Sequence, residues 1–313
     1  MVSSNFNLRH CCPACGSEEF RTINKYLYSD VRIVSYITDS YRVDSDEFES
    51  VVDDAYYSIL ECQKCTLLFQ GYVPSESFLP IIYDEYIDAS GSLSNKKLTK
   101  EHSRLYLGDF ALIQKLLGKT PDQIRILDYA AGWGNWIGLA NQSGFKTYAL
   151  ELSEHRKEHL SSLGIQVIEE TYLSNMVVDF VNCDQIFEHL TDPTTVLKLI
   201  SSALSGDGLV RISVPHSFRP SKEVSLLNHG LRDGFKIPDI LAPLEHLNYF
   251  NRRSLRAFAE SAGFELIEPS LWDYVRTSNF GGDSISETIK TIIRPFYRKN
   301  FANIVFLKKV EIT

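Results

Sequence analysis

The stretch that decides the fold of this chain is Asp128-Tyr-Ala-Ala-Gly132-Trp-Gly134. It follows an apolar run, Ile124–Leu127, and leads into an apolar segment with helical character. Glu151 stands 19 residues after Gly132, at the end of a second apolar run. A strand, a glycine-containing turn, a helix and then an acidic residue that ends the next strand are how a doubly wound α/β domain holds a nucleoside. We therefore expect a nucleoside ligand whose two ribose hydroxyls bind Glu151.

The turn lacks the full G-x-G-x-x-G of dinucleotide binders. It resembles motif I of the class I S-adenosylmethionine (SAM) methyltransferases, hydrophobic-D-x-[GA]-x-G-x-G, with Ala130 at the first glycine position. On these residues alone, a tight turn in another α/β protein stays an alternative. The resemblance implies a SAM-dependent methyltransferase whose turn cradles the methionine part of the cofactor. The implied cofactor-binding residues are Asp128, Ala130, Gly132, Gly134, Glu151 and Leu152.

Apolar runs and helical segments alternate over most of the chain after residue 120. Such alternation predicts an α/β fold with a parallel sheet and right-handed crossovers. By the resemblance it is a doubly wound, seven-stranded, Rossmann-like methyltransferase sheet of strand order 3-2-1-4-5-7-6. Strands are expected over 124–127, 146–150, 165–168, 180–183, 209–214, 264–267 and 303–310. Helices are expected over 133–143, 153–163, 193–204, 251–262 and 285–297, and residues 215–243 as a loop or lid over the site.

The bulk composition is that of a soluble globular protein. The 313 residues suffice for one large domain and a small one, and 44% are hydrophobic. The formal charge of −8 argues against a nucleic-acid partner. The sequence shows neither an apolar run that could span a bilayer nor the apolar core of a signal peptide, so we expect a cytoplasmic protein. A reducing compartment makes the six cysteines metal ligands or free thiols rather than disulfides.

Two Cys-x-x-Cys knuckles stand 46 residues apart, Cys12-Pro-Ala-Cys15 and Cys62-Gln-Lys-Cys65. Each knuckle places two thiolates on one side of a tight turn, and two knuckles complete a tetrahedral site with four sulfur ligands. A closed site of this kind predicts one structural zinc, with four unrelated thiols or a redox centre as the alternatives. The expected parts are a zinc-binding module over 1–75, a helical connector over 76–120 and a SAM-dependent methyltransferase domain over 121–313.

Two further motifs narrow the resemblance. They are Phe187-Glu188-His189-Leu190-Thr-Asp192-Pro193 and Leu244-Glu245-His246-Leu247-Asn248-Tyr249-Phe250. With the zinc module and the segment Tyr86-Ile-Asp-Ala-Ser90-Gly91-Ser92, they resemble the zinc-containing sugar C-methyltransferases of deoxysugar pathways. That family has a further C-terminal domain that helps bind the nucleotide-sugar, and this chain stops at the end of the SAM domain.

The resemblance implies His246 as general base with Glu245 beside it, and His189 and Tyr86 nearby in the acceptor cleft. The implied acceptor is a sugar or nucleotide-sugar. A histidine that titrates near neutral pH suits removal of the C3 proton of a 4-ketosugar, and a second His or Tyr can hydrogen-bond the enolate oxygen. O-methylation would need only a base for a hydroxyl proton. The remaining alternatives are a methyltransferase of another small molecule or lipid, and a non-catalytic SAM-fold subunit that binds a protein partner through its zinc module.

Overall fold

The computed structural model describes residues 5–52, 54–87, 98–215, 237–281 and 284–310. The chain folds into two compact units, and both are discontinuous in sequence. Unit 1 consists of Met1–Asn95, Phe187–Thr194 and Ser217–Ser261, and unit 2 of Lys96–Ile186, Thr195–His216 and Ala262–Thr313. The division expected from the sequence, at residues 75 and 120, is linear and does not separate these units. Two segments from the second half of the chain, both carrying a Glu-His pair, fold with the N-terminal module instead.

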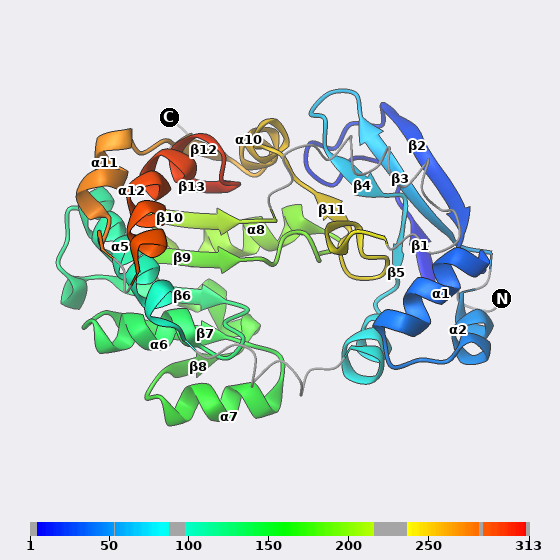
Figure 1. Ribbon diagram of the computed structural model, residues 1–313, viewed down its shortest axis with the longest axis horizontal. Coiled ribbons are helices and arrows are strands. Elements are labelled where there is room, and N and C mark those ends of the chain that lie inside the picture. Colours follow the sequence, from blue (N-terminus) through cyan, green and yellow to red (C-terminus); the bar gives the residue numbers. More distant parts are fainter. Residues whose placement is uncertain (1–4, 53, 88–97, 216–236, 282–283, 311–313) are drawn as a thin grey trace. The chain divides into compact units, whose positions relative to one another are not determined.

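Unit 2 is built on a seven-stranded mixed sheet (Figure 1). Its strands are β6 (Arg125–Tyr129), β7 (Lys146–Leu150), β8 (Gln166–Ile168), β9 (Val178–Asp184), β10 (Leu204–Ser213), β12 (Phe264–Ile267) and β13 (Ile304–Lys309). Their order across the sheet is β12-β13-β10-β9-β6-β7-β8. The five strands β6 to β10 pair in parallel, and β13 is antiparallel to both of its neighbours, so β12 runs in the same direction as those five strands. This order is the predicted 3-2-1-4-5-7-6 counted from the opposite edge, so the predicted fold class is confirmed.

Helices accompany this sheet. They are α5 (Lys100–Leu117), α6 (Asn135–Gln142), α7 (Glu154–Ser162), α8 (Pro193–Ala203), α11 (Leu271–Thr277) and α12 (Ile285–Asn300), with 3-10 turns η2 (Pro121–Gln123) and η3 (Glu170–Asn175). α5 begins where the Thr99 hydroxyl accepts a hydrogen bond from the His102 amide, and it ends at Gly118, which adopts a left-handed φ of 65°. α11 packs against α5 and α12, as Figure 1 shows. Side chains from the sheet and helices, including Phe110, Trp136 and Phe180, form one hydrophobic core.

Unit 1 contains an antiparallel sheet of order β11-β4-β3-β2 and a separate pair, β1 with β5. The strands are β1 (Phe6–Leu8), β2 (Phe20–Leu27), β3 (Tyr56–Cys62), β4 (Leu68–Gln70), β5 (Tyr72–Pro74) and β11 (Asn248–Tyr249). The helices are α1 (Val31–Ser40), α2 (Ser45–Val51), α3 (Leu79–Ile81), the π-helical η1 (Ile82–Tyr86), the 3-10 turn η4 (Asp239–Leu241) and α10 (Arg252–Ser261). Buried aromatic side chains such as Tyr28, Phe48, Tyr57 and Phe78 fill its core.

The topology of unit 1 joins segments that are far apart in the chain. β2, α1, α2 and β3 occupy the stretch between the two cysteine knuckles, and β11 adds the second Glu-His motif to the edge of the same sheet. Residues 216–236 of the predicted lid lie outside the described residues, as do residues 88–97 with Ser90, Gly91 and Ser92. Within the described ranges, none of the helices has the length and apolar character needed to cross a membrane.

Candidate functional site

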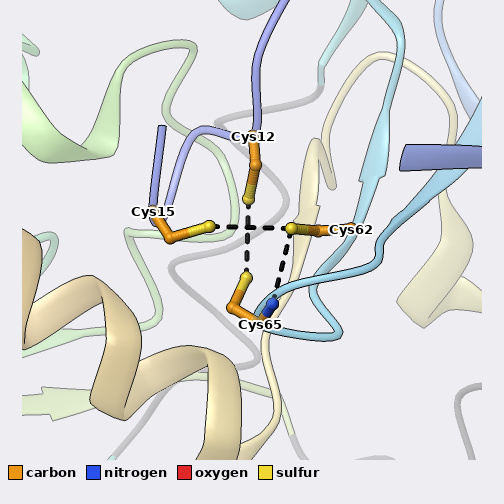
Figure 2. Close-up of side chains that lie close together, drawn as sticks. All are labelled: Cys12, Cys15, Cys62 and Cys65. Carbon is orange, nitrogen blue, oxygen red and sulfur yellow. Dashed lines mark hydrogen bonds between the residues drawn. The ribbon is translucent and has the colours of Figure 1, made fainter. Parts of the chain in front are cut away.

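The four knuckle cysteines of unit 1 converge on one point (Figure 2). The Sγ atoms of Cys12 and Cys65 lie 3.5 Å apart, and those of Cys15 and Cys62 lie 3.6 Å apart. Four sulfurs around a zinc ion at bond lengths of about 2.3 Å are separated by about 3.8 Å in a tetrahedron. All four cysteines are free of disulfides. The predicted ligands are therefore brought together with spacing that fits a zinc ion.

Both knuckles have the backbone that such a site needs. The residue after each second cysteine, Gly16 or Thr66, adopts a positive φ of 70° or 63°. Thr66 holds this strained conformation while its carbonyl accepts a hydrogen bond from the Asn251 side chain. The first knuckle is braced in the same way, because the hydroxyls of Thr194 and Ser261 donate to the carbonyls of Pro13 and Ala14. Segments that belong to the second half of the chain thus hold the cysteine turns in place.

The predicted cofactor turn of unit 2 lies between β6 and α6. Ala130, Gly132 and Gly134 all adopt left-handed φ values, of 60°, 56° and 72°. Gly134 has no room for a side chain, because a Cβ there would lie 2.5 Å from the Leu160 side chain. Gly132 differs, since a Cβ on it would meet nothing within 4 Å. The turn is therefore closely packed where the helix begins and open beside Gly132, where a ligand can approach the backbone.

Glu151 lies at the end of β7 and is hydrogen-bonded to this turn. Its Oε2 accepts from the Gly132 amide at 2.8 Å, and its Oε1 accepts from the amides of Leu152 and Ser153 at 3.0 and 3.1 Å. A carboxylate offers about four acceptor sites, so three backbone bonds leave one for a ligand hydroxyl. The sequence predicted that Glu151 binds both ribose hydroxyls, and the second one requires that a backbone bond be given up. Leu152 is 84% exposed, which suits an apolar contact with a flat ring.

Asp128 lies deeper than the turn, in a buried polar network. Its Oδ1 accepts from the Asn182 side chain at 2.7 Å, and Asn182 in turn accepts from Arg211, which also contacts Asp184. Burial raises the pKa of Asp128 to about 7, partly offset by the Asn182 hydrogen bond. Asn182, Arg211 and Asp184 were not predicted as site residues from the sequence. They could have been found as polar residues within two otherwise apolar strands, because a polar residue buried in a sheet needs a hydrogen-bond partner.

The two Glu-His motifs meet within unit 1. The rings of His189 and His246 lie 4.8 Å apart between centroids. The Nδ1–H of His189 donates to the Glu245 carbonyl at 3.0 Å, which leaves a lone pair on Nε2 in the neutral ring. Burial, and then the neighbouring His246, lower the pKa of His189 to about 4, so it is neutral at pH 7. The Nδ1 atom of His246 is buried and has no hydrogen-bond partner among the described residues.

Backbone and side-chain bonds fix the two motifs to each other. The Glu188 carbonyl accepts from the amides of Leu247 and Asn248, at 2.7 and 3.0 Å. The Asn248 side chain donates to the carbonyls of Phe187 and Leu190. Leu244, immediately before Glu245 and His246, adopts a φ of 69°. Strain of this kind costs of order 1–3 kcal/mol and persists only where surrounding contacts impose it, often at functional sites.

Arg9 is a second clamp on the motifs that the sequence analysis missed. Its guanidinium is buried and donates to the carbonyls of Leu190, Thr191 and Leu247 and to the side-chain oxygen of Asn248. Burial lowers its pKa to about 10, and the group stays charged at neutral pH. One residue of the N-terminal module thus ties together the loops that carry both histidines.

The resemblance implied Tyr86 near the histidines in the acceptor cleft, and the structure buries its side chain. It is 1% exposed, belongs to the core cluster of unit 1 and packs edge-on against Phe78. A side chain buried in this way is poorly suited to contact an acceptor. Tyr83, one helical turn earlier, is 40% exposed, and burial of its hydroxyl followed by the charges of Glu245 and Glu188 raises its pKa to about 12. Tyr83 is therefore the more exposed of the tyrosines near the motifs, while the buried Tyr41 donates to the Pro243 carbonyl just before the second motif.

The model of a methyltransferase domain family matches residues 101–268, which is more than half of the chain. The chain belongs to this methyltransferase family. It is a SAM-dependent methyltransferase, as the sequence analysis predicted. No curated protein matches its sequence.

Several solved methyltransferases are similar to this one. A SAM-dependent methyltransferase from Archaeoglobus fulgidus has 18% identity and a TM-score of 0.39, over 66% of this chain and 94% of the other. The plantazolicin methyltransferase BpumL in complex with SAH has 14% identity and a TM-score of 0.47, over 74% and 94%. The 1,6-didemethyltoxoflavin-N1-methyltransferase of Burkholderia thailandensis has 15% identity and a TM-score of 0.43, over 75% and 86%.

The turn of unit 2 fits the cofactor of this methyltransferase. The open space beside Gly132, the carboxylate of Glu151 with one acceptor site left, and the exposed Leu152 supply a backbone approach, a hydroxyl acceptor and an apolar ring contact. Asp128 at the end of β6 belongs to the hydrogen-bond network that joins it to Asn182 of β9 and Arg211 of β10.

The histidine cluster of unit 1 could also bind a cation. Donor atoms of Glu188, His189 and His246 all lie within 4.8 Å of one another. Two imidazoles and a carboxylate are ligands that zinc and other divalent transition metals accept. The arrangement is compatible with two kinds of chemistry. One is proton transfer by His246 beside the neutral His189, and the other is metal binding by Glu188, His189 and His246.

Proposed function

We propose that this SAM-dependent methyltransferase methylates a sugar or nucleotide-sugar, at carbon rather than at oxygen, with His246 as the general base. The observation that supports it is the buried Nδ1 atom of His246, which has no hydrogen-bond partner among the described residues; the ring centroids of His246 and the neutral His189 lie 4.8 Å apart. The same cluster contains the Glu188 carboxylate, and the charges of Glu245 and Glu188 act on the Tyr83 hydroxyl. Carbon methylation requires a base and hydrogen-bond donors for an enolate, and this set contains both.

The roles of the residues follow from their contacts. His246 removes the proton at C3 of a 4-keto acceptor and becomes an imidazolium, which the Glu245 and Glu188 carboxylates nearby stabilise. His189 is fixed by its bond to the Glu245 carbonyl and is neutral. Tyr83 keeps its proton at neutral pH and can donate to the developing oxyanion. Bound SAM supplies an electrophilic methyl group, and Glu151 and the turn at Gly132 hold it.

The test is a pair of measurements on the full chain. The protein is incubated with methyl-labelled SAM and a panel of nucleotide-sugars that includes 4-keto sugars, and label is sought in the product. Exchange of the acceptor C3 proton with solvent deuterium is then followed by NMR. We expect exchange in the wild type and none in His246→Ala, with turnover lowered roughly 100-fold or more and SAM affinity retained. His102→Ala, an exposed histidine of α5, is the matched control.

Other outcomes would correct the proposal. Methyl transfer to a sugar without C3 exchange in the wild type would indicate O-methylation. Label in a different small molecule or a lipid, with none in any sugar, would reject the acceptor class. A second metal ion per chain that is lost in His246→Ala would indicate that His246 is a metal ligand and that the reaction at the histidine cluster is assisted by a metal. Tyr83→Phe should lower turnover while Tyr86→Phe should not; the reverse result would restore Tyr86 to the site.

We also propose that the four knuckle cysteines hold one structural zinc, and that the protein works in the reducing cytoplasm that such thiolates require. Metal analysis should find one zinc per chain, and X-ray absorption should show four sulfur ligands at about 2.3 Å. Cys62→Ser should lower the melting temperature and also lower turnover, because the knuckles are hydrogen-bonded to the segment that carries His189. Cys11→Ser is the control, because Cys11 is exposed and next to a ligand. A protein that folds with no stoichiometric metal would refute the zinc assignment.

A further inference from the structure

Helix α12 of unit 2 presents its apolar face to solvent. Five large hydrophobic side chains along it are between 51% and 82% exposed: Ile285, Ile289, Ile292, Ile293 and Phe296. A helix that packs on a globular core normally turns such a stripe inward. In α12 the apolar stripe faces solvent instead.

The inward face of α12 is short of large apolar side chains. Its buried residues are Thr291, Pro295 and Arg298, and Arg298 forms an ion pair with Asp109 of α5. Arg294 forms a second ion pair with α5, to Glu101 at 2.7 Å. These bonds anchor the helix on its own unit with the apolar stripe facing out, so the stripe is not a consequence of a helix that has failed to dock.

The spacing of the exposed residues is that of a helix–helix seam. Positions 285, 289, 292 and 296 follow one another at intervals of four, three and four, which is the a/d pattern of a heptad. In an antiparallel pair of α12 helices related by a two-fold axis, Ile285 lies opposite Phe296, and Ile289 lies opposite Ile292. All four seam positions are apolar, so the stripe is complementary to itself.

The size of the stripe also suits a second copy. The five exposed side chains offer roughly 550 Å² of apolar surface, at the upper end of the largest patches on monomers. Two copies would together cover about 1,100 Å², just above the area that a specific interface requires. A membrane surface fits less well, because three of the four cations of the helix are engaged in ion pairs with Glu101, Asp109 and Glu268.

We propose that α12 is the two-fold interface of a homodimer, formed by antiparallel packing of its exposed stripe against the same stripe of a second chain. An interface of this kind is isologous, and each seam residue is used twice. Substitutions on the stripe should therefore act on association and leave the fold of unit 2 in place, because the ion pairs on the opposite face hold the helix.

The test uses the full chain in analytical ultracentrifugation across a micromolar concentration series. We expect a species of twice 35.7 kDa. Ile292→Glu alone and Ile289→Lys alone should each weaken dimerisation by roughly 100-fold or more, because each buries an unpaired charge twice. An equimolar mixture of the two variants should dimerise again, since the new Glu faces the new Lys across the axis while the other contact stays apolar. Val31→Glu, at an exposed apolar residue of α1, is the control and should remain dimeric.

Three results would overturn the proposal. The wild type could be monomeric at about 100 µM, a concentration at which a specific interface of this area should be populated. Ile292→Glu could remain dimeric, which would place the interface elsewhere. A monomer that sediments with anionic phospholipid vesicles, and no longer does so as Ile292→Glu, would assign the stripe to a membrane surface. Circular dichroism of each variant confirms that the fold is retained.

Discussion

Replacing Glu151 by Gln should separate cofactor binding from catalysis more clearly than any other single change. The carboxylate accepts three backbone bonds, from Gly132, Leu152 and Ser153, and has one acceptor site left for a ribose hydroxyl. The Gln side chain has one carbonyl oxygen and one amide group. Its amide must therefore point a donor either at the backbone amides or at the ligand hydroxyl.

The magnitude follows from the bonds at stake. A hydrogen bond to a charged group contributes about 1.5–3 kcal/mol, so losing one to the ribose should weaken SAM binding roughly 10- to 100-fold. A donor facing the Gly132 amide should also loosen the turn and lower the melting temperature of the free protein by a few degrees. Glu151→Ala should weaken binding at least tenfold as well, without the added donor.

Isothermal titration calorimetry with SAM and with S-adenosylhomocysteine is the assay. Glu154→Gln is the matched control, because Glu154 stands three residues later on α7 and its side chain is 82% exposed in an ion pair with Lys157. It should bind both ligands as the wild type does. A Glu151→Gln protein that stays folded and binds SAM within about twofold of the wild type would refute the assignment of Glu151 to the cofactor.

Three further changes test the site and its supports. Ala130→Gly should raise stability by about 0.5–1 kcal/mol, because Ala130 holds a φ of 60°; a lower melting temperature would contradict this. The pKa of His189 is about 4 in the folded protein and about 6.5 in the unfolded chain, so the unfolded chain binds the imidazole proton more tightly than the folded protein does. The free energy of unfolding should therefore fall by up to about 3 kcal/mol as the pH drops from about 6.5 towards 4. Denaturation of His189→Asn should show a flatter pH profile in that window. Removing zinc with a chelator should abolish turnover while calorimetry still detects SAM binding; loss of SAM binding at the same chelator concentration would contradict this.

The sheet could be predicted from the sequence because its signals are local. Each strand from β6 to β10 is a short apolar run bounded by glycine or polar residues, and the order followed from the resemblance. α11 was not predicted although Ser270 and Asp273 form a capping box there, because the helix is only seven residues long and its apolar periodicity covers a single turn. β11 could not be found locally, since its two residues are defined by pairing with β4, about 180 residues earlier in the chain.

The candidate site also has parts that could be predicted from the sequence and parts that could not. The cysteines and the glycine turn were readable because spacing alone specifies their geometry. The resemblance of the segment Tyr86–Ser92 to a family motif points to Tyr86. Motif spacing alone cannot say which of two tyrosines three residues apart, Tyr83 or Tyr86, faces the core. In the structure the π-helical turn η1 buries Tyr86 and exposes Tyr83. Arg9 could not be found from the sequence because its five hydrogen-bond acceptors come from three separate segments, at residues 70, 190–191 and 247–248.

The contacts within unit 1 link the cysteine cluster to the two histidines. A zinc ion there would support the proposed acceptor chemistry by holding these histidines in place, without taking part in the reaction. The segment that carries His189 continues directly to Thr194, whose hydroxyl holds the first knuckle at Pro13. Arg9, just before that knuckle, binds the loops of both histidines. A zinc ion that fixes the knuckles would therefore also fix the proposed base and its neutral partner, through hydrogen bonds from the Thr194 and Arg9 side chains to backbone carbonyls. The cofactor turn, in unit 2, is held by its own contacts to β7 and α7, with Glu151 and Leu160 as the closest examples. Metal binding and SAM binding should for this reason be energetically separable, while metal binding and acceptor chemistry should not.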